Sequence, residues 1–320
     1  MKKIILSLII LACLNLPLKA QWIQLTSPSS NTLYSIYFIN PSLGFISGSL
    51  NGTVIKTTDG GASWIFTSTG TNSTFYDVLF LNQQTGFVAG TLKQVIKTTN
   101  SGLNWDIKTS GSGTHYSIAF PSSTIGYAAG GLPTVLDKSV DNGNNWSVVT
   151  PPTSNSLRGV NFIDNSTGWF CGYGGTIWKT TDGSFSWIPQ TQSVSFNFEE
   201  IVFLNSTTGY VVGSGGFSNA GIIMKTINSG ANWVLQSTPL TTPLYDFHFI
   251  NLTTGWAVGG SGKIIKTTDG GANWFQQNSP SGTAVYYGIH MADANTGYIV
   301  GSGGILLKTT NGGGNPIVPV

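Results

Sequence analysis

Acidic side chains that recur in a repeated turn are the first candidates for chemistry in this 320-residue chain. The first copy runs from Thr57 to Trp64 and reads Thr-Thr-Asp-Gly-Gly-Ala-Ser-Trp. Such carboxylates would suit acid–base catalysis or metal binding, but neutral asparagine replaces aspartate in three copies. We therefore expect a structural acceptor that bonds backbone N–H groups two residues on, with glycine supplying positive φ. The position is occupied by Asp59, Asn100, Asp141, Asp182, Asn228, Asp269 and Asn311.

Histidine and cysteine offer little further chemistry. His248 and His290 occupy the same place in neighbouring repeats, so that either a metal pair or packing between repeats would explain them. We favour packing. Cys171 is the one cysteine beyond residue 20, which leaves no partner for a disulfide and no thiolate cluster. The sequence thus predicts no catalytic residues, no metal and no cofactor.

The elements that position these side chains follow from three residue columns that share one period. Successive members lie 40 to 42 residues apart, with a single spacing of 46 in each column where the fifth repeat is longer. The tryptophans are Trp22, Trp64, Trp105, Trp146, Trp187, Trp233 and Trp274. The glycines, each followed by an aromatic residue, are Gly44, Gly86, Gly126, Gly168, Gly209, Gly255 and Gly297. The lysines are Lys56, Lys97, Lys138, Lys179, Lys225, Lys266 and Lys308.

Each repeat contains four short apolar runs, in the first repeat near 33–39, 44–48, 53–57 and 64–67, separated by Gly, Asn or Asp. This spacing is typical of antiparallel strands. A period of about 40–45 residues with four strands indicates one propeller blade. The sequence predicts an all-β, seven-bladed β-propeller of four-stranded antiparallel blades. The last repeat lacks its tryptophan, so we expect the N-terminal strand at Trp22–Thr26 to close the last blade.

The domain boundaries follow. Lys2 and Lys3, the apolar run Ile4–Leu16 and small Ala20 have the pattern of a signal peptide over residues 1–20. The propeller is assigned to 21–311 and a Gly/Pro-rich tail to 312–320. We expect export to the periplasm, the cell surface or the medium, and no transmembrane segment in the mature chain.

The composition excludes a disordered protein and a nucleic-acid-binding protein. Aromatic residues make up 12% of the chain and charged residues 8%, the reverse of a disordered protein. Arg158 is the one arginine, and the 14 basic residues scarcely outnumber the 12 acidic ones. Such a chain has no electrostatic footprint for nucleic acid. We expect a monomer.

The Thr-x-Asp-Gly-x-x-x-Trp turn resembles the Asp-box of bacterial-neuraminidase-type repeats. The unit from Gly255 to Trp274 is similar to the photosystem II assembly/stability-factor propellers and their exported bacterial relatives. The resemblance implies a seven-bladed exported propeller that binds proteins. Phototrophic members carry a patch of arginines from which this chain, with Arg158 alone, departs.

Two classes of hydrolase are alternatives to a protein-binding propeller. A sialidase shares the box but needs an arginine triad for the sugar carboxylate, which one arginine cannot supply. Other glycosidases need two carboxylates about 5–10 Å apart. Glu199 and Glu200 are adjacent, so we expect them on opposite faces of a strand. Asp77 and Asp246 are placed to approach each other across the central channel.

The candidate binding surface is the start of the innermost strand, ten residues before each recurrent glycine. This column holds Tyr34, Tyr76, Tyr116, Arg158, Glu199, Tyr245 and Tyr287. Either this column surrounds the mouth of the channel, together with Asp77 and Asp246, or it fills space between blades. The second arrangement would follow from the face that the column shares with the core Phe column. Phe217, in the longer loop of the fifth repeat, is a further candidate contact.

We therefore predict a non-enzymatic scaffold that binds an unidentified protein through the channel mouth. The alternative is a carbohydrate-binding adhesin whose Tyr and Trp side chains stack on a glycan, and a glycoside hydrolase ranks below both.

Overall fold

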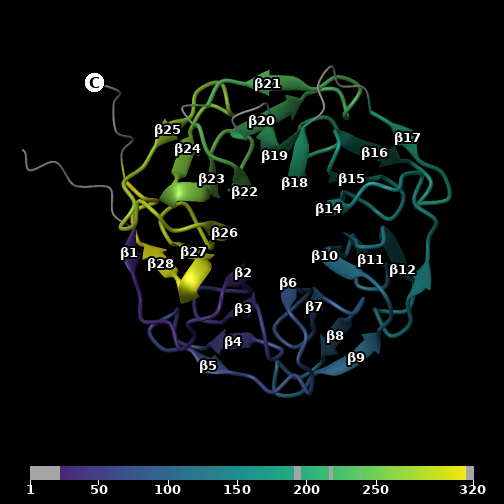
Figure 1. The fold of residues 1–320 in the computed structure, drawn as a ribbon, viewed down its shortest axis with the longest axis horizontal. Coiled ribbons are helices and arrows are strands. Elements are labelled where there is room, and N and C mark those ends of the chain that lie inside the picture. Colours follow the sequence, from purple (N-terminus) through teal and green to yellow (C-terminus); the bar gives the residue numbers. More distant parts are fainter. Residues whose placement is uncertain (1–21, 191–195, 216–218, 239, 315–320) are drawn as a thin grey trace, which may run out of the picture.

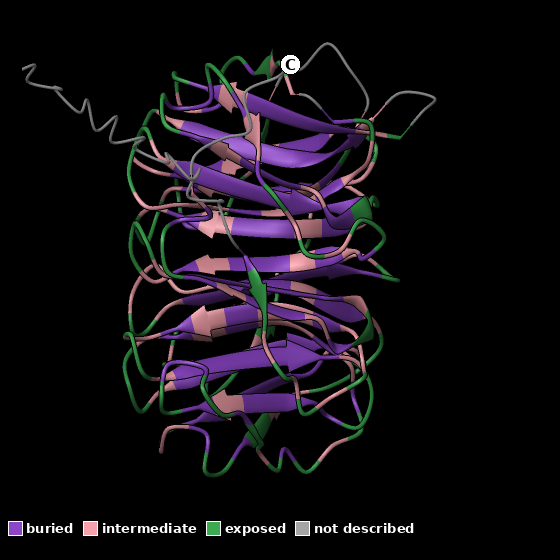
Figure 2. Cartoon of the chain, turned by 90° about the vertical axis from the view of Figure 1, so that its left-hand side faces the viewer, coloured by how far each residue is buried: buried purple, intermediate pink, exposed green. Residues whose placement is uncertain are grey.

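Each repeat folds into four antiparallel strands because its short β-branched and aromatic runs are separated by Gly, Asn and Asp turns. The computed structural model describes residues 22–190, 196–215, 219–238 and 240–314. Seven four-stranded sheets stand around one axis and close into a ring (Figure 1). Seen edge-on, buried residues fill the strands and exposed residues gather in the turns (Figure 2). The predicted seven-bladed propeller is confirmed.

We name the four strands of a blade a to d, from the axis to the rim. Strands a are β2 (Leu33–Phe38), β6 (Phe75–Phe80), β10 (Thr114–Ala119), β14 (Leu157–Phe162), β18 (Asn197–Phe203), β22 (Leu244–Phe249) and β26 (Tyr286–Met291). Strands b are β3 (Gly44–Gly48), β7 (Gly86–Gly90), β11 (Gly126–Gly131), β15 (Gly168–Gly172), β19 (Gly209–Gly215), β23 (Gly255–Gly259) and β27 (Gly297–Gly301). Strands c are β4 (Val54–Thr57), β8 (Val95–Thr98), β12 (Val135–Ser139), β16 (Thr176–Thr180), β20 (Ala220–Thr226), β24 (Ile264–Thr267) and β28 (Leu306–Thr309). Strands d are β5 (Ile65–Phe66), β9 (Asp106–Thr109), β13 (Ser147–Val148), β17 (Ile188–Pro189), β21 (Val234–Gln236), β25 (Phe275–Gln276) and β1 (Ile23–Gln24). Short 3₁₀ turns, η1 (Gly260–Gly262) and η2 (Ser302–Gly304), join strands b and c of the last two blades.

The recurrent glycine-aromatic pair makes the contact between blades. A Cβ on Gly86 would come within 2.5 Å of the Phe80 ring, so glycine leaves room for that ring. In six of the seven cases the residue after the glycine stacks on a Phe of the next blade; the Phe45 and Phe80 ring centroids, for example, lie 4.1 Å apart. The other stacked pairs are Phe87–Phe120, Tyr127–Phe162, Trp169–Phe203, Tyr210–Phe249 and Tyr298–Phe38. Packing between blades therefore explains why the glycine and the aromatic residue after it recur in each repeat.

The boxes are closed turns between strands c and d. In the second box the Thr98 hydroxyl accepts the N–H of Gly102 at 2.9 Å and donates to Asn100 Oδ1 at 3.0 Å. Asn100 Oδ1 in turn accepts the N–H of Asn104 at 3.0 Å. The Asx bond thus reaches four residues on rather than the expected two, because the threonine takes the nearer N–H groups. Asp59 makes the equivalent bond, and the Ser63 hydroxyl and N–H hold the pKa of its carboxyl down at about 2.

Lysines of strand c tie six blades to the next box. Lys97 Nζ donates to the carbonyl of Asn142 at 2.7 Å, with its ammonium 5.7 Å from the Phe87 ring centroid. The equivalent bonds join Lys56 to Ser101, Lys138 to Gly183, Lys225 to Gly270, Lys266 to Gly312 and Lys308 to Gly60. The lysine column is therefore structural.

The ring closes where the two ends of the described chain meet. Strand β1 pairs with β28 through Ile23↔Lys308 and Gln24↔Leu307, which completes the seventh blade as predicted. Trp22 is 2% exposed and its Nε1–H donates to Gln277 Oε1 at 3.0 Å. Gln277 Nε2 donates to the carbonyls of Gly312 and Gly314, so the last box extends to Gly314.

One inter-blade contact departs from this apolar pattern. His115 and Asp137 stand in columns that hold Leu33 and Ile55 in the first blade, yet both are at most 1% exposed. His115 Nε2 lies 3.1 Å from Asp137 Oδ2, and Lys93 Nζ reaches the same oxygen at 3.0 Å. His115 Nδ1 and Asp137 Oδ1 are buried without a partner among the described residues. Blades two and three are thus joined by a buried charge network.

Candidate functional site

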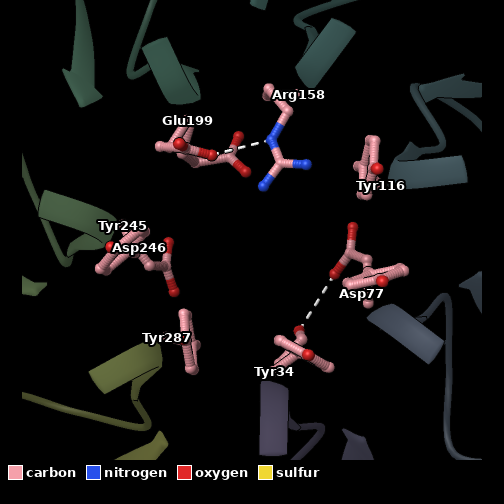
Figure 3. A pocket seen from close by; sticks show the side chains of 11 residues that line it. Tyr34, Asp77, Tyr116, Arg158, Glu199, Tyr245, Asp246 and Tyr287 are labelled. Atoms are coloured by element: carbon pink, nitrogen blue, oxygen red, sulfur yellow. Dashed lines mark hydrogen bonds and ion pairs between the residues drawn. The ribbon is translucent and has the colours of Figure 1, made fainter. Parts of the chain in front are cut away.

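The starts of the seven strands a surround a pocket on the propeller axis, which we call the mouth pocket (Figure 3). Its volume is about 110 Å³. It lies at the end that carries the b–c turns, since Ser49 in such a turn bonds Thr32 just before β2, whereas the first box bonds the a–b turn at Ser42. Its wall is formed by Tyr34, Ser35, Tyr76, Asp77, Tyr116, Arg158, Glu199, Glu200, Tyr245, Asp246 and Tyr287. All nine channel-mouth candidates that the structure describes line one pocket.

A β-bulge in every blade aims these side chains at the axis. In the first blade Leu33 pairs with Gly48 and Ser35 with Ser47, so that Tyr34 is an extra residue without a partner. The same step occurs at the tyrosine column in all seven blades. A bulge interrupts the alternation of side chains along a strand. The tyrosines therefore line the channel instead of following the Phe column between blades.

The bulge also corrects the expectation for the adjacent glutamates. Phe198 pairs with Gly213 and Glu200 with Val212, which leaves Glu199 as the extra residue. Glu199 and Glu200 consequently both line the mouth pocket rather than pointing to opposite faces.

Five tyrosines form a continuous arc around the pocket. Neighbouring ring centroids lie 5.1 Å apart for Tyr245–Tyr287, 5.2 Å for Tyr287–Tyr34, 4.7 Å for Tyr34–Tyr76 and 4.9 Å for Tyr76–Tyr116. Each ring is partly buried. Burial, together with the neighbouring tyrosines, raises the pKa of Tyr76 to about 12, so its hydroxyl stays neutral.

Arg158 and Glu199 close the arc as an ion pair. Arg158 Nε donates to Glu199 Oε2 at 2.8 Å, and the guanidinium lies 3.9 Å above the centroid of the Tyr116 ring. The hydroxyl of Tyr173, from the fourth b–c turn, donates to Glu199 Oε1 at 3.1 Å. Both carboxylate oxygens are thereby occupied.

Three more carboxyl groups form a second layer one residue further along each strand. Asp246 accepts the N–H of Phe247 at 2.7 Å and that of Ile289, in the next blade, at 2.8 Å. Asp77 does the same with the N–H groups of Val78 and Ile118. Glu200 accepts the N–H of Ile201 at 2.9 Å. Asp77 and Asp246 point toward the axis from opposite sides (Figure 3).

These bonds bear on the hydrolase alternative. Each oxygen of Asp77 and of Asp246 accepts a backbone N–H, which takes up one of its two lone pairs and fixes the carboxyl group against the next blade. Glycosidase carboxylates need one free nucleophile or base and one proton donor. The pair is therefore better suited to holding neighbouring blades together.

The second layer predicts a pH-dependent stability. Burial raises the pKa of Asp246 to about 7, outweighing its N–H donors. Because the folded state then binds the proton more tightly than the unfolded state, Asp246 destabilises the fold increasingly as the pH rises from about 4 to 7. Serine occupies this column at Ser35 and Ser117, and Ser117 Oγ accepts the next blade's N–H from Val160. We expect the unfolding free energy of Asp246→Ser, relative to that of wild type, to rise by about 3 kcal/mol between pH 4.5 and pH 8.

Urea unfolding at the two pH values measures this change. Ser117→Ala lies in the same column without an ionisable group and should alter stability equally at both. An Asp246→Ser effect that is independent of pH would contradict the prediction.

His248 and His290 pack against each other. The rings of His248 and His290 lie 4.8 Å apart, and His290 also contacts Tyr37 at 5.1 Å. Burial lowers the pKa of His248 to about 4. Among the described residues, no cluster of three or more His, Cys, Asp or Glu side chains is arranged to hold a metal ion. Cys171 is buried as a free thiol, and burial raises its pKa.

Some predicted features lie outside the described residues: the leader 1–20, Phe217 and residues 315–320 of the tail. In the described part, no helix is both long and apolar enough to span a membrane.

Sequence reasoning missed three exposed leucines on the mouth face. Leu50, Leu92 and Leu132 are 58%, 60% and 77% exposed at the b–c turns of blades one to three. Each has a φ near +60°, a region that leucine rarely adopts. Ser35, Glu200 and Tyr173 were missed as well. The column after the tyrosines signalled the first two, whereas Tyr173 stands in a turn position where other blades have small residues such as Ser49 and Thr91.

Comparison with known proteins follows the same repeats. The sequence profile of the family described as photosynthesis system II assembly factor YCF48 matches residues 63–159 and 225–316, more than half of the chain. No curated protein sequence matches.

Solved structures share the fold. YCF48 bound to D1 peptide is 21% identical with a TM-score of 0.74, covering 91% of this chain and 97% of that one. YCF48 from Cyanidioschyzon merolae is 20% identical with a TM-score of 0.73, covering 90% and 98%. Virginiamycin B lyase from Staphylococcus aureus is 13% identical with a TM-score of 0.75, covering 91% and 99%. At such identities each likeness shows the propeller fold alone.

Proposed function

The chain belongs to the family of the photosynthesis system II assembly factor YCF48, and on that premise we propose that it is an exported, non-enzymatic scaffold. It binds a protein partner with its mouth face. Assembly factors act by holding other proteins, and one solved relative is bound to a D1 peptide. The partner of this chain is left open, because loop surfaces differ between propellers of one fold.

The observation that carries the proposal is the bulge that turns seven large side chains toward one pocket. Tyrosine and arginine are the residue types that contribute most to protein interfaces. Leu50, Leu92 and Leu132 extend the surface outward on blades one to three. A backbone outlier at a large apolar residue is a feature that binding would explain.

The absence of catalytic roles is part of the proposal. Glu199 is bonded to Arg158 and Tyr173, and Asp77 and Asp246 are bonded to backbone N–H groups that hold blades together. The lyase that shares the fold supplies no matching site at 13% identity. Export is proposed from the leader pattern at residues 1–20.

The glycan alternative is weakened for the tryptophans. Trp64, Trp105, Trp233 and Trp274 are only 6–8% exposed and pack in the blade cores, so they offer no face for a sugar. The tyrosine arc would have to provide any stacking.

Cross-linking capture from the native envelope tests the proposal. We expect wild type to capture a discrete protein that the variant Tyr76→Ala/Arg158→Ala/Glu199→Ala loses while it keeps its fold. A box-face variant, Phe185→Ala, serves as the control because Phe185 is 90% exposed at the other end of the propeller. Equal capture by wild type and the mouth variant would contradict the proposal. Binding to a glycan array, abolished by Tyr76→Ala, would favour the adhesin instead.

A further inference from the structure

The charge in the mouth pocket is unbalanced, although the pocket contains the one arginine. Its wall holds four carboxyl groups and a single guanidinium. We propose that the mouth pocket receives a cationic side chain, lysine or arginine, from the protein partner. This inference rests on the proposed function and specifies the chemistry of the partner at the same site.

The aromatic wall suits a cation. Five tyrosine rings surround the axis with neighbouring centroids 4.7–5.2 Å apart. Aromatic rings attract a cation through their quadrupole, more strongly when water is excluded. The chain already shows this contact, because the Arg158 guanidinium lies 3.9 Å from the Tyr116 ring centroid. The five hydroxyls of the arc make no hydrogen bond to any other described residue, which leaves their oxygens free to accept from a ligand.

The existing cation is already neutralised. Arg158 is 23% exposed and Glu199 11%, and the 2.8 Å bond from Arg158 Nε to Glu199 Oε2 pairs the guanidinium with a carboxylate. A carboxylate ligand would approach a guanidinium that is already paired and would also face Asp77, Glu200 and Asp246 below. The mouth pocket therefore disfavours an anionic ligand.

The second layer supplies acidic groups that lack a counter-ion. Asp77, Glu200 and Asp246 line the pocket beneath the tyrosines and have no lysine or arginine bonded to them among the described residues. Their backbone donors are neutral. A flexible lysine or arginine side chain can pass through the ring of tyrosines and place its charge near this layer. Burial raises the pKa values of these acids, which favours their protonated forms in the empty pocket, whereas a bound cation favours their ionised forms.

Two matched substitutions give opposite predictions. Five blades carry tyrosine where the fourth and fifth carry Arg158 and Glu199, so Arg158→Tyr and Glu199→Tyr each extend the existing arc. Arg158→Tyr removes a like charge and frees Glu199, which should tighten cation binding several-fold. Glu199→Tyr frees Arg158, which should weaken it about tenfold.

The probes are the peptides Ac-Gly-Lys-Gly-NH₂ and Ac-Gly-Arg-Gly-NH₂, with norleucine and glutamate versions as controls. Binding is followed by ¹⁹F NMR of 3-fluorotyrosine in the folded protein, with resonances assigned by Tyr→Phe substitutions. We expect the mouth tyrosines to shift with the basic peptides and not with norleucine.

Two outcomes would overturn the inference: binding of the glutamate peptide in preference to the basic ones, or no shift by basic peptides in either wild type or Arg158→Tyr. Capture of a partner through the mouth face would then still support the scaffold. Conversely, basic-peptide binding without mouth-dependent capture would leave the pocket chemistry standing and remove the scaffold.

Discussion

Replacing Asp137 with alanine is expected to destabilise the propeller by about 3–5 kcal/mol, the range for breaking a buried ion pair. His115 is fully buried and Lys93 only 15% exposed, and both lose their shared partner oxygen. Their hydrogen bonds hold the pKa of Asp137 below its usual range even though burial alone would raise it. The Lys93 ammonium and the His115 ring would be left without this partner between two sheets. Urea unfolding at pH 7 measures the loss.

The repeat supplies its own control. The equivalent columns hold Leu33, Ile55 and Asn51 in the first blade, so His115→Leu/Asp137→Ile/Lys93→Asn restores the apolar pattern. Replacing a buried ionic network by apolar residues is often neutral or stabilising. We expect this triple variant to unfold within about 1 kcal/mol of wild type, or above it. A cost below about 1 kcal/mol for Asp137→Ala would show that water compensates the network.

Deleting residues 22–26 is expected to prevent stable folding. The deletion removes the pairing of β1 with β28 and exposes a strand edge that invites association. Loss of buried Trp22 alone corresponds to about 3–5 kcal/mol, much of the 5–15 kcal/mol that stabilises a typical domain. Thermal unfolding with light scattering gives the measurement.

Moving the same five residues to follow Gly314 through a short linker should restore the fold. The other six blades connect strand c directly to strand d, so the permuted chain reproduces an arrangement already present. A deletion variant with an unchanged melting temperature, or a permuted chain that aggregates as the deletion does, would show that ring closure does not limit stability.

The propeller was predictable because its period is set by contacts that repeat in every blade. Phe87, Phe120 and Gly126 show the reason: the stack needs an aromatic residue from each of two blades and a glycine that leaves room for one ring. The His115–Asp137 network was not predictable, since it joins columns that lie apart in the sequence and breaks their apolar pattern.

The mouth residues were predictable by column, and their orientation was not. Alternation along a strand places Tyr34 on the face of Phe38, whereas the bulge at Tyr34 shifts it to the channel. The same bulge brings Glu199 and Glu200 to one pocket. The sequence signal for it was a large polar residue at the same strand position in each blade, too general to specify a bulge.

The scaffold function is tested most directly by a photo-cross-linker placed on each face of the propeller in the native host. p-Benzoylphenylalanine would replace Leu92 on the mouth face, Phe185 on the box face or Ile65 on the rim, all of which are well exposed. We expect one partner protein to be cross-linked from position 92 and not from 185 or 65. Cross-linking of the partner from the box face or the rim, with none from position 92, would contradict the assignment of the mouth as the binding surface.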